Sequence, residues 1–337
     1  MPNIIQPKNI DSAALLLQAG GVVAIPTETV YGLAADISNE QAVRQIFALK
    51  QRPIDHPLII HICDLNQLEQ FAIKIPEYAF LLARSFWPGP LTLVLYKSQL
   101  VGDWVTGGQD TVGIRMPNHP LTLSLINRVG SPLAAPSANQ FGKISPTHIS
   151  HVAAEFGERV PVLDGGHCMV GIESTIVDAT EEMFCTILRP GMISEQALKA
   201  VLGNHIEIKQ PNNKSKQVSG TLKTHYAPQK PTYLFAGREE LLGIKSRTAK
   251  SVYGLVLTED CKQLCQQSSL MSTTSEDYAQ KLYNALRTAD NSDCDIIAIE
   301  RPPRVQEWQG IMDRLERSSA ATMYSAVSHV ESDESVI

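Results

Sequence analysis

The sequence predicts two α/β domains joined by a basic linker. Its 337 residues are more than one hydrophobic core usually serves. Short apolar runs alternate with helical patterns on both sides of residues 209–231, a stretch rich in Pro, Asn, Ser and Gly. We therefore expect a mixed α/β domain at residues 1–208, a linker at 209–231, a small parallel Rossmann-like α/β domain at 232–322 and a flexible tail at 323–337.

A helix and a buried strand are expected to open the first domain. Asp11 is suited to cap an amphipathic helix through residues 15–17, and Gly20 and Gly21 end that helix before a strand at residues 22–25. Further strands are predicted, with helical patterns between several of them, at residues 58–62, 91–96, 111–115, 132–135 and 160–163. These elements predict a mixed α/β sheet.

A hairpin and a helix are expected to close this domain. Residues 173–178 and 185–188 are short β-branched runs around a polar stretch, and a helix at residues 194–202 follows them. In the second domain, strands are predicted at residues 252–257 and 295–299, and helices at residues 276–287 and 308–317. Strands that alternate with helices favour a parallel sheet.

Composition indicates an ordinary globular protein. Hydrophobic residues make up 43% of the chain and charged residues 19%. The six cysteines show no CxxC spacing, so we expect reduced thiols and a cytosolic location. No apolar stretch approaches the length of about 18 residues that a membrane helix needs. The net charge of −6 argues against a protein whose main role is to wrap nucleic acid.

Common signatures of nucleotide and metal sites are absent from the sequence. It has no GxxxxGK[ST] loop, no GxGxxG fingerprint, no HExxH, no GxSxG and no metal-spaced set of Cys and His. Loops rich in small, polar and proline residues occur instead at the ends of predicted strands, at residues 26–32, 50–53, 87–90, 136–139 and 164–166. Such loops are where α/β proteins build their sites.

Two residue pairs in these loops suit an anionic ligand. Lys50 and Arg52 alternate, so in an extended segment their side chains would point the same way and could bind phosphate oxygens. Ser137 and Asn139 share that spacing and offer hydroxyl and amide groups. Taken alone, each pair is better explained by a solvated loop with a proline-fixed turn.

Taken together, the loops resemble those of the threonylcarbamoyl-AMP synthases, the proteins with a YrdC-like domain, in their long form with an additional C-terminal domain. The matching segments, in family order, are PTETVYGL (26–33), KQRP (50–53), HPLIIHI (56–62), WPGPLT (87–92), TVGIRMPNHP (111–120), APSAN (135–139), DGG (164–166), GIESTIVD (171–178), LRPG (188–191) and THYAP (224–228). The second domain matches more weakly, chiefly in IMDRLERSSAA (311–321).

The resemblance implies a function and a more specific fold. L-threonine, bicarbonate and ATP would be condensed to threonylcarbamoyl-AMP and pyrophosphate, a nucleotidyltransferase reaction whose product feeds the threonylcarbamoyladenosine modification of tRNA. The implied fold is an open, twisted mixed sheet with a central positive cavity. Mg²⁺ is expected to accompany ATP. Contact with the machinery that transfers the threonylcarbamoyl group would be transient, and tRNA binding would be weak or indirect.

The resemblance also assigns roles to residues. Positions where the family holds threonine are occupied by Thr29, His61, Arg115, Ala135 and Ser174. Positions where it contacts ATP are occupied by Arg52, His56, Thr111, Ser137, Ser145, Arg189 and Tyr226. The catalytic Lys-x-Arg and Ser-x-Asn signature falls on Lys50, Arg52, Ser137 and Asn139. Arg115 suits the threonine carboxylate because its guanidinium can pair bidentately.

The chain departs from the family pattern at two places. His56 stands where some relatives have an Asn that contacts ATP. Residues 219–221 read Ser-Gly-Thr where many relatives have Pro-Gly, which leaves the path of the linker open.

The linker is basic, and its role has two readings. Between Glu207 and Glu239 no acidic residue occurs, whereas positive side chains recur at Lys209, Lys214, Lys216, Lys223, Lys230 and Arg238. The segment could order over the triphosphate as a lid when ATP binds, or it could be a soluble tether.

Two other functions are compatible with the same domain. One is an RNA-binding module, against which stand the acidic net charge and the lack of RNP-type aromatic motifs. The other is a carbamoyl transferase with another acceptor, since related domains occur in hydrogenase maturation proteins. This chain lacks the acylphosphatase and zinc-finger cysteine segments of those proteins.

Overall fold

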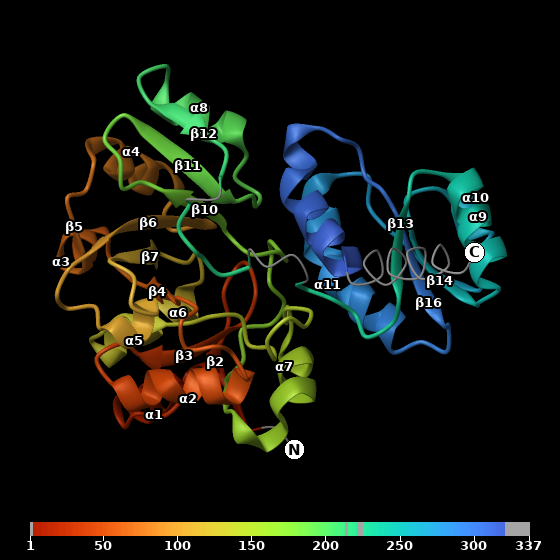
Figure 1. Cartoon of the computed structure of the whole chain (residues 1–337). Coiled ribbons are helices and arrows are strands. Elements are labelled where there is room, and N and C mark those ends of the chain that lie inside the picture. Colours follow the sequence, from red (N-terminus) through yellow and green to blue (C-terminus); the bar gives the residue numbers. More distant parts are fainter. Residues whose placement is uncertain (1–2, 213–214, 221–224, 321–337) are drawn as a thin grey trace, which may run out of the picture. The chain divides into compact units, whose positions relative to one another are not determined.

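The computed structural model describes residues 3–212, 215–220 and 225–320 of the chain (Figure 1). It divides into two compact units, the first formed by Met1–Phe141 and Ser145–Thr221, the second by Gly142–Ile144 and Leu222–Ile337. Both units are α/β, so the predicted fold class is confirmed. The predicted tail at residues 323–337 lies outside the described residues.

The first unit is built on one mixed 12-stranded sheet with the order β1-β9-β2-β3-β8-β4-β7-β6-β10-β11-β12, and β5 pairs with β6 at its side. Its strands are β1 (Ile4–Ile5), β2 (Val23–Ile25), β3 (Gly32–Asp36), β4 (Ile59–His61), β5 (Ala72–Ile73), β6 (Leu91–Lys97), β7 (Thr111–Arg115), β8 (Leu133–Ala134), β9 (Val162–Leu163), β10 (Thr175–Asp178), β11 (Phe184–Arg189) and β12 (Glu207–Lys209). Its helices are α1 (Ile10–Gln18), α2 (Glu40–Lys50), α3 (Leu68–Phe71), α4 (Glu77–Phe86), α5 (Asp103–Thr106), α6 (Pro120–Val129), α7 (Ile149–Phe156) and α8 (Glu195–Leu202).

Strand register brings several chain segments to one edge of this sheet. β4 and β7 are parallel, with His61 opposite Arg115, so both strands end at the same edge. β6 is antiparallel to β7 and begins there, and β10 runs parallel to β6 with Thr175 opposite Leu91. The last residues of β4 and β7 therefore lie beside the first residues of β6 and β10.

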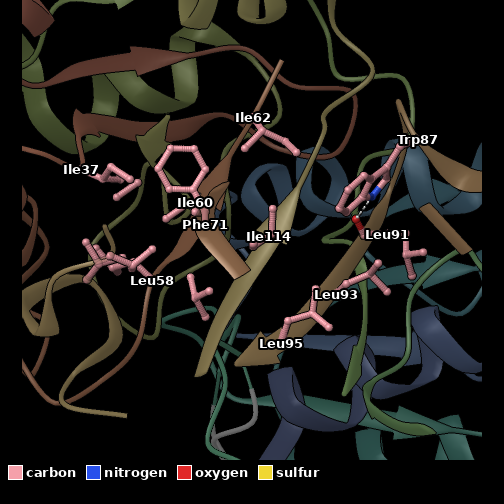
Figure 2. Close-up of a cluster of buried hydrophobic side chains, with 14 of the residues drawn as sticks. Ile37, Leu58, Ile60, Ile62, Phe71, Trp87, Leu91, Leu93, Leu95 and Ile114 are labelled. Carbon is pink, nitrogen blue, oxygen red and sulfur yellow. Dashed lines mark hydrogen bonds between the residues drawn. The ribbon is translucent and has the colours of Figure 1, made fainter. Parts of the chain in front are cut away.

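The alternation of β6 places its side chains on two faces of the sheet. Leu91, Leu93 and Leu95 are fully buried and contribute to the large hydrophobic core that Figure 2 shows. The indole Nε1 of Trp87 donates to the Leu91 carbonyl at 2.8 Å, which fixes the start of the strand (Figure 2). Because successive side chains point to opposite faces, Thr92 emerges on the other side of the sheet. The strand predicted at residues 91–96 thus contributes leucines to the core and Thr92 to the opposite face.

The N-termini of α1 and α2 begin in different ways. Asn39 caps α2, since its Oδ1 accepts a hydrogen bond from the Ala42 N–H at 3.0 Å. The expectation that Asp11 caps α1 is wrong. Asn9 holds that position without a side-chain hydrogen bond, and Asp11 lies in the first turn, where it pairs with Arg128 at 2.8 Å.

The second unit contains a parallel four-stranded sheet with the order β13-β16-β14-β15. Its elements are β13 (Thr232–Phe235), α9 (Arg238–Thr248), β14 (Val252–Val256), α10 (Glu259–Lys262), β15 (Gln267–Leu270), α11 (Ser275–Asp290) and β16 (Ile296–Glu300), and residues 309–320 are helical. The parallel α/β layer is as predicted. β13 and β15 were not predicted. Among the described residues, no helix has the length and apolar character needed to cross a bilayer.

Candidate active site

The loop between β2 and β3 is organised by one threonine hydroxyl. The Oγ1 of Thr27 donates to the Val30 carbonyl at 2.6 Å and accepts the N–H groups of Thr29 and Val30 at 3.2 Å each. Such local side-chain bonds favour a turn over continued strand. The turn presents Glu28 and Thr29, which are 5% and 0% exposed, as neighbours on one buried loop.

Arg115, at the end of β7, is the centre of a buried polar cluster with that loop. Its Nη1 donates to Thr29 Oγ1 at 2.9 Å, and its Nε donates to the Gly89 carbonyl at 3.3 Å. Its Nη2 lies 2.7 Å from Glu28 Oε2, an ion pair without the angle of a hydrogen bond. The structure therefore brings the predicted Thr29 and Arg115 together, and it adds Glu28 to them.

His61 lies beside Arg115 in the register of β4 and β7. It is 3% exposed, and no described residue hydrogen-bonds its Nδ1. Burial, reinforced by the positive charge of Arg115, lowers the pKa of His61 from 6.5 to about 3. The imidazole is accordingly neutral at physiological pH and available as a hydrogen-bonding group.

This shifted pKa predicts an acid-sensitive stability. Between pH 6.5 and 3 the unfolded chain binds a proton at His61 that the folded protein excludes, so the free energy of unfolding falls as the pH falls. The loss from this group should be about 2 kcal/mol at pH 5. Urea denaturation of wild type and His61→Asn at pH 7.5 and pH 5 measures it. An equal pH-dependent loss in both proteins would contradict the prediction.

Lys50 contacts the backbone of Ser137 and Asn139, the other predicted pair. Its Nζ donates to the backbone carbonyls of Ser137 and Asn139, both at 2.5 Å. The expectation of an extended segment from Lys50 to Arg52 is wrong, because Lys50 ends α2 and Gln51 adopts the left-handed conformation with φ 53°. Burial, and next the charge of Arg52, holds the pKa of Lys50 well below its usual value of 10.5.

Arg52 follows this turn and lies close to an aromatic ring. Its Nη2 donates to the Pro57 carbonyl at 3.0 Å, and its guanidinium lies 5.5 Å from the ring centre of Phe141. The His56 ring meets the same phenyl ring edge-on at 5.3 Å. Burial, and next Arg52, lowers the pKa of His56. His56 and Arg52 thus share one aromatic partner that sequence reasoning did not identify.

Arg189 and Ser174 meet at the start of β10. The Arg189 Nη2 donates to the Ser174 carbonyl at 2.9 Å and to its Oγ at 3.1 Å, and Ser174 Oγ lies 2.8 Å from Thr92 Oγ1. Ser145 is fully buried and donates to Glu173 Oε1 at 2.5 Å. These contacts bring Ser174, Arg189 and Thr92 to the sheet edge that carries Arg115.

Linker residues 217–219 lie against the face of the sheet that carries Thr92 and Val94. A cavity of about 20 Å³ lies between the strands and this segment, with Thr111 and Gln217 among its lining residues. Val218 is 9% exposed and packs with Val94 in a small apolar cluster. Arg189 Nη1 donates to the Ser219 carbonyl at 2.9 Å. Thr111 therefore lines a space that the linker segment covers.

The basic groups of the linker are largely paired. Lys216 Nζ lies 2.9 Å from Asp178 Oδ2, and Lys209 pairs with Glu207 at 3.4 Å. Lys230 donates to the carbonyl of Ala289 at 3.2 Å. Lys214 and Lys223 lie outside the described residues.

Two remaining predicted residues take separate places. Ala135 is buried after β8, and its N–H donates to the Ile59 carbonyl at 3.1 Å. Tyr226 belongs to the second unit, where it is 1% exposed, with its ring 5.8 Å from that of Tyr283 and the Arg314 guanidinium 5.3 Å from its centre. Among the described residues, no group of three or more His, Cys, Asp or Glu side chains could hold a metal ion.

No role was predicted for the two acidic members of these clusters. Glu28 lies within PTETVYGL and Glu173 within GIESTIVD. The available signal was chemical: each is an acidic residue in a loop otherwise made of small, apolar and hydroxyl side chains. The structure places Glu28 on Arg115 and Glu173 on Ser145.

Comparison with known proteins identifies the family. The family described as "Telomere recombination" matches residues 15–191, and that described as "Threonylcarbamoyl-AMP synthase, C-terminal domain" matches residues 193–320. A protein of Pyrococcus abyssi called threonylcarbamoyl-AMP synthase is 39% identical, over 94% of this chain and 95% of its own length. A Bacillus subtilis protein of the same name is 40% identical, over 92% of each chain.

The fold agrees with these matches. The crystal structure of P. abyssi Sua5 complexed with L-threonine superimposes with a TM-score of 0.86 and 37% identity, covering 96% of this chain and 98% of the other. Since both domain families and relatives along nearly the whole length match, the chain belongs to the threonylcarbamoyl-AMP synthase family in its two-domain form.

Proposed function

We propose that this protein is an L-threonylcarbamoyladenylate synthase. It condenses L-threonine, bicarbonate and ATP to threonylcarbamoyl-AMP and pyrophosphate, and its product serves the threonylcarbamoyladenosine modification of tRNA. Family membership and the names of its relatives support this function. The single structural observation that carries it is the buried cluster of Arg115, Thr29 and His61 at the sheet edge shared with Arg189 and Ser174.

The cluster suits an amino acid beside a triphosphate. Arg115 can pair bidentately with the threonine carboxylate, and Thr29, His61, Ser174 and the backbone at Ala135 supply further polar contacts. We assign ATP to Arg52, His56, Thr111, Ser137, Ser145 and Arg189 of the first unit, and Lys50, Arg52, Ser137 and Asn139 to catalysis. Tyr226 of the second unit stays a predicted ATP contact. Phosphate charge would favour the protonated form of the buried Lys50, which supplies a donor matched to the ligand.

The chemistry needs positioning and charge stabilisation. The threonine nitrogen attacks the carbon of bicarbonate, and an oxygen of the resulting carbamate attacks the α-phosphorus as the bond to pyrophosphate breaks. Holding the reactants in line can lower the activation barrier by about 7–11 kcal/mol. Arg52, Lys50 and Arg189 offset charge that develops on the phosphates.

A Mg²⁺ ion is proposed to enter with ATP. Such ions usually keep several water ligands and bind substrate phosphates rather than an all-protein cage. When bound, the ion would neutralise part of the charge on the β- and γ-phosphates. The residues named above would then hold the metal–nucleotide complex through its remaining phosphate oxygens.

The domain organisation, the partners and the location complete the proposal. The domains are assigned to residues 1–208 and 232–322, with the linker at 209–231. Transfer of the threonylcarbamoyl group to tRNA requires a partner enzyme, with which contact is proposed to be transient, and tRNA binding by this chain is proposed to be weak or indirect. The cytosolic location remains a prediction from the free cysteines.

Mass spectrometry tests the function directly. Purified protein is incubated with ATP, L-threonine and ¹³C-bicarbonate, and the products are analysed for threonylcarbamoyl-AMP carrying one labelled carbon. Omission of threonine should abolish this species and leave pyrophosphate release at background. Label in a carbamoylated product that forms without threonine would instead indicate a carbamoyl transferase with another acceptor.

Segment 215–220 is predicted to act as a lid over the nucleotide. Burying a Val side chain is worth about 1.5–3 kcal/mol, so Val218→Asp should open the segment about 10-fold or more. We expect ATP to slow tryptic cleavage after Lys216 in wild type, and the variant to be cleaved faster and to need more ATP. Val305→Asp, at a site 52% exposed, is the control. Equal cleavage with and without ATP would support a simple tether.

A further inference from the structure

Glu28 is a buried carboxylate that the proposed site leaves without a role. Both of its oxygens are inaccessible to solvent, and no described residue gives either one a hydrogen bond of good geometry. Among the described residues, its ionic partner is Arg115, whose Nη2 lies 2.7 Å from Glu28 Oε2. A buried carboxylate without donors is costly unless another cation or donor completes its environment. The arrangement therefore points to a ligand group that is positively charged.

The neighbours of Glu28 indicate which positively charged ligand group would fit beside it. Arg115 already engages Thr29 and Gly89, and it faces Glu28 through Nη2. His119 and Cys168 are close enough to sense the Glu28 charge. Burial lowers the pKa of His119, which favours its neutral imidazole, and raises the pKa of Cys168, which favours its neutral thiol, so neither supplies a positive charge. Within the described cluster, Arg115 is thus the counter-charge of Glu28, and the pair as a whole is neutral.

A neutral Arg–Glu pair is complementary to an amino acid zwitterion. The Arg115 guanidinium can bind the carboxylate of the ligand while the Glu28 carboxylate binds its ammonium group. One ion pair within the protein is thereby replaced by two ion pairs between protein and ligand. No net charge is added to the buried site, which limits the desolvation cost of binding. We infer that Glu28 binds the α-ammonium group of threonine and accepts a proton from it for carbamate formation. This inference rests on the proposed function.

The step balances. A proton passes from the ammonium nitrogen to a Glu28 oxygen, which leaves a neutral amine. The nitrogen lone pair forms a bond to the carbon of bicarbonate, and the C–OH bond breaks as hydroxide leaves with a second nitrogen proton as water. The product is the carbamate, and the proton on Glu28 returns to solvent. Only substrates of the proposed reaction take part.

Binding without ATP tests the ammonium contact independently of turnover. Isothermal titration compares L-threonine with the matching 2,3-dihydroxybutanoate, in which a hydroxyl replaces the ammonium group. Wild type should prefer threonine at least about 10-fold, since a charge-assisted hydrogen bond contributes about 1.5–3 kcal/mol. Glu28→Gln should lose most of this preference. If Glu28 had a purely structural role, Glu28→Gln would bind both ligands more weakly by the same factor, and the preference for threonine would stay intact.

Turnover tests the proton transfer. Glu28→Gln should lower kcat about 10²-fold or more at saturating threonine, as expected for loss of a general base. Glu28→Asp, which keeps the charge, should retain the ammonium preference and recover part of kcat. Glu40→Gln, at an exposed position of α2, serves as the amide control. Failure of wild type to form labelled product would refute the proposed function, whereas an active Glu28→Gln or one that keeps the preference overturns the inference.

Discussion

Replacing Arg52 with Ala should lower ATP-dependent pyrophosphate release about 10²- to 10³-fold, the usual effect of removing a group that stabilises transition-state charge. Arg52 is 6% exposed, and its charge contributes to the lowered pKa of Lys50. It therefore marks a strongly positive, desolvated position where phosphate oxygens fit. The assay measures pyrophosphate with saturating threonine and bicarbonate, so that an effect on ATP chemistry is isolated.

Arg44→Ala provides the matched control for Arg52. Arg44 lies on the same helix, α2, but its side chain is 55% exposed and pairs with Glu40 at 2.6 Å in the manner of a surface ion pair. Its removal should leave turnover within about twofold, since such pairs contribute about 0–1 kcal/mol. Unchanged turnover in Arg52→Ala would refute the role of Arg52, provided that circular dichroism shows both variants folded.

Arg115→Gln should affect both threonine use and stability. Loss of a charge-assisted contact of about 3 kcal/mol lowers kcat/KM for threonine about 10²-fold. The same change leaves Glu28 buried without its ionic partner, which should cost about 3–5 kcal/mol of unfolding free energy. Threonine titration of the rate and urea denaturation measure the two effects. Arg128→Gln, at a site 44% exposed, should change neither appreciably.

A double-mutant cycle separates the two effects of Arg115. Glu28→Gln together with Arg115→Gln removes both charges, so the double variant should regain much of the stability that Arg115→Gln loses. The coupling free energy of neighbouring charged residues is about 0.5–3 kcal/mol. Additive losses would show that the 2.7 Å pair contributes nothing to the folded state. Catalysis should not recover, because the double variant lacks both proposed ligands of threonine.

The sequence predicted strands well where apolar alternation was strong. β7 spans Thr111–Arg115, as predicted, because its alternation and β-branched residues both favour extended structure. β3 was missed because Gly32–Asp36 reads GLAAD, which lacks β-branched residues and is held by its neighbours β2 and β8. Tertiary pairing overrides propensity there.

The site was predictable as a set of residues and not as a set of contacts. Lys50 and Asn139 were both named from their motifs, but the bond from Lys50 Nζ to the Asn139 backbone depends on the end of α2 and the left-handed Gln51. Glu28 lay in a quoted motif without a role, because its significance comes from Arg115, which is distant in the chain and adjacent only through the fold. Local patterns carry no information on such partners.

The contacts that build the site also constrain how the protein is made. Lys50 and Asn139 are separated by 89 positions, and Arg189 binds the backbone of Ser219, 30 positions further on. Synthesis on the ribosome delivers the earlier partner of each pair well before the later one, and non-local contacts of this kind form slowly. The ability to bind substrates should therefore emerge only after residue 219 has left the exit tunnel. A nascent chain stalled earlier would expose its charged site residues to water.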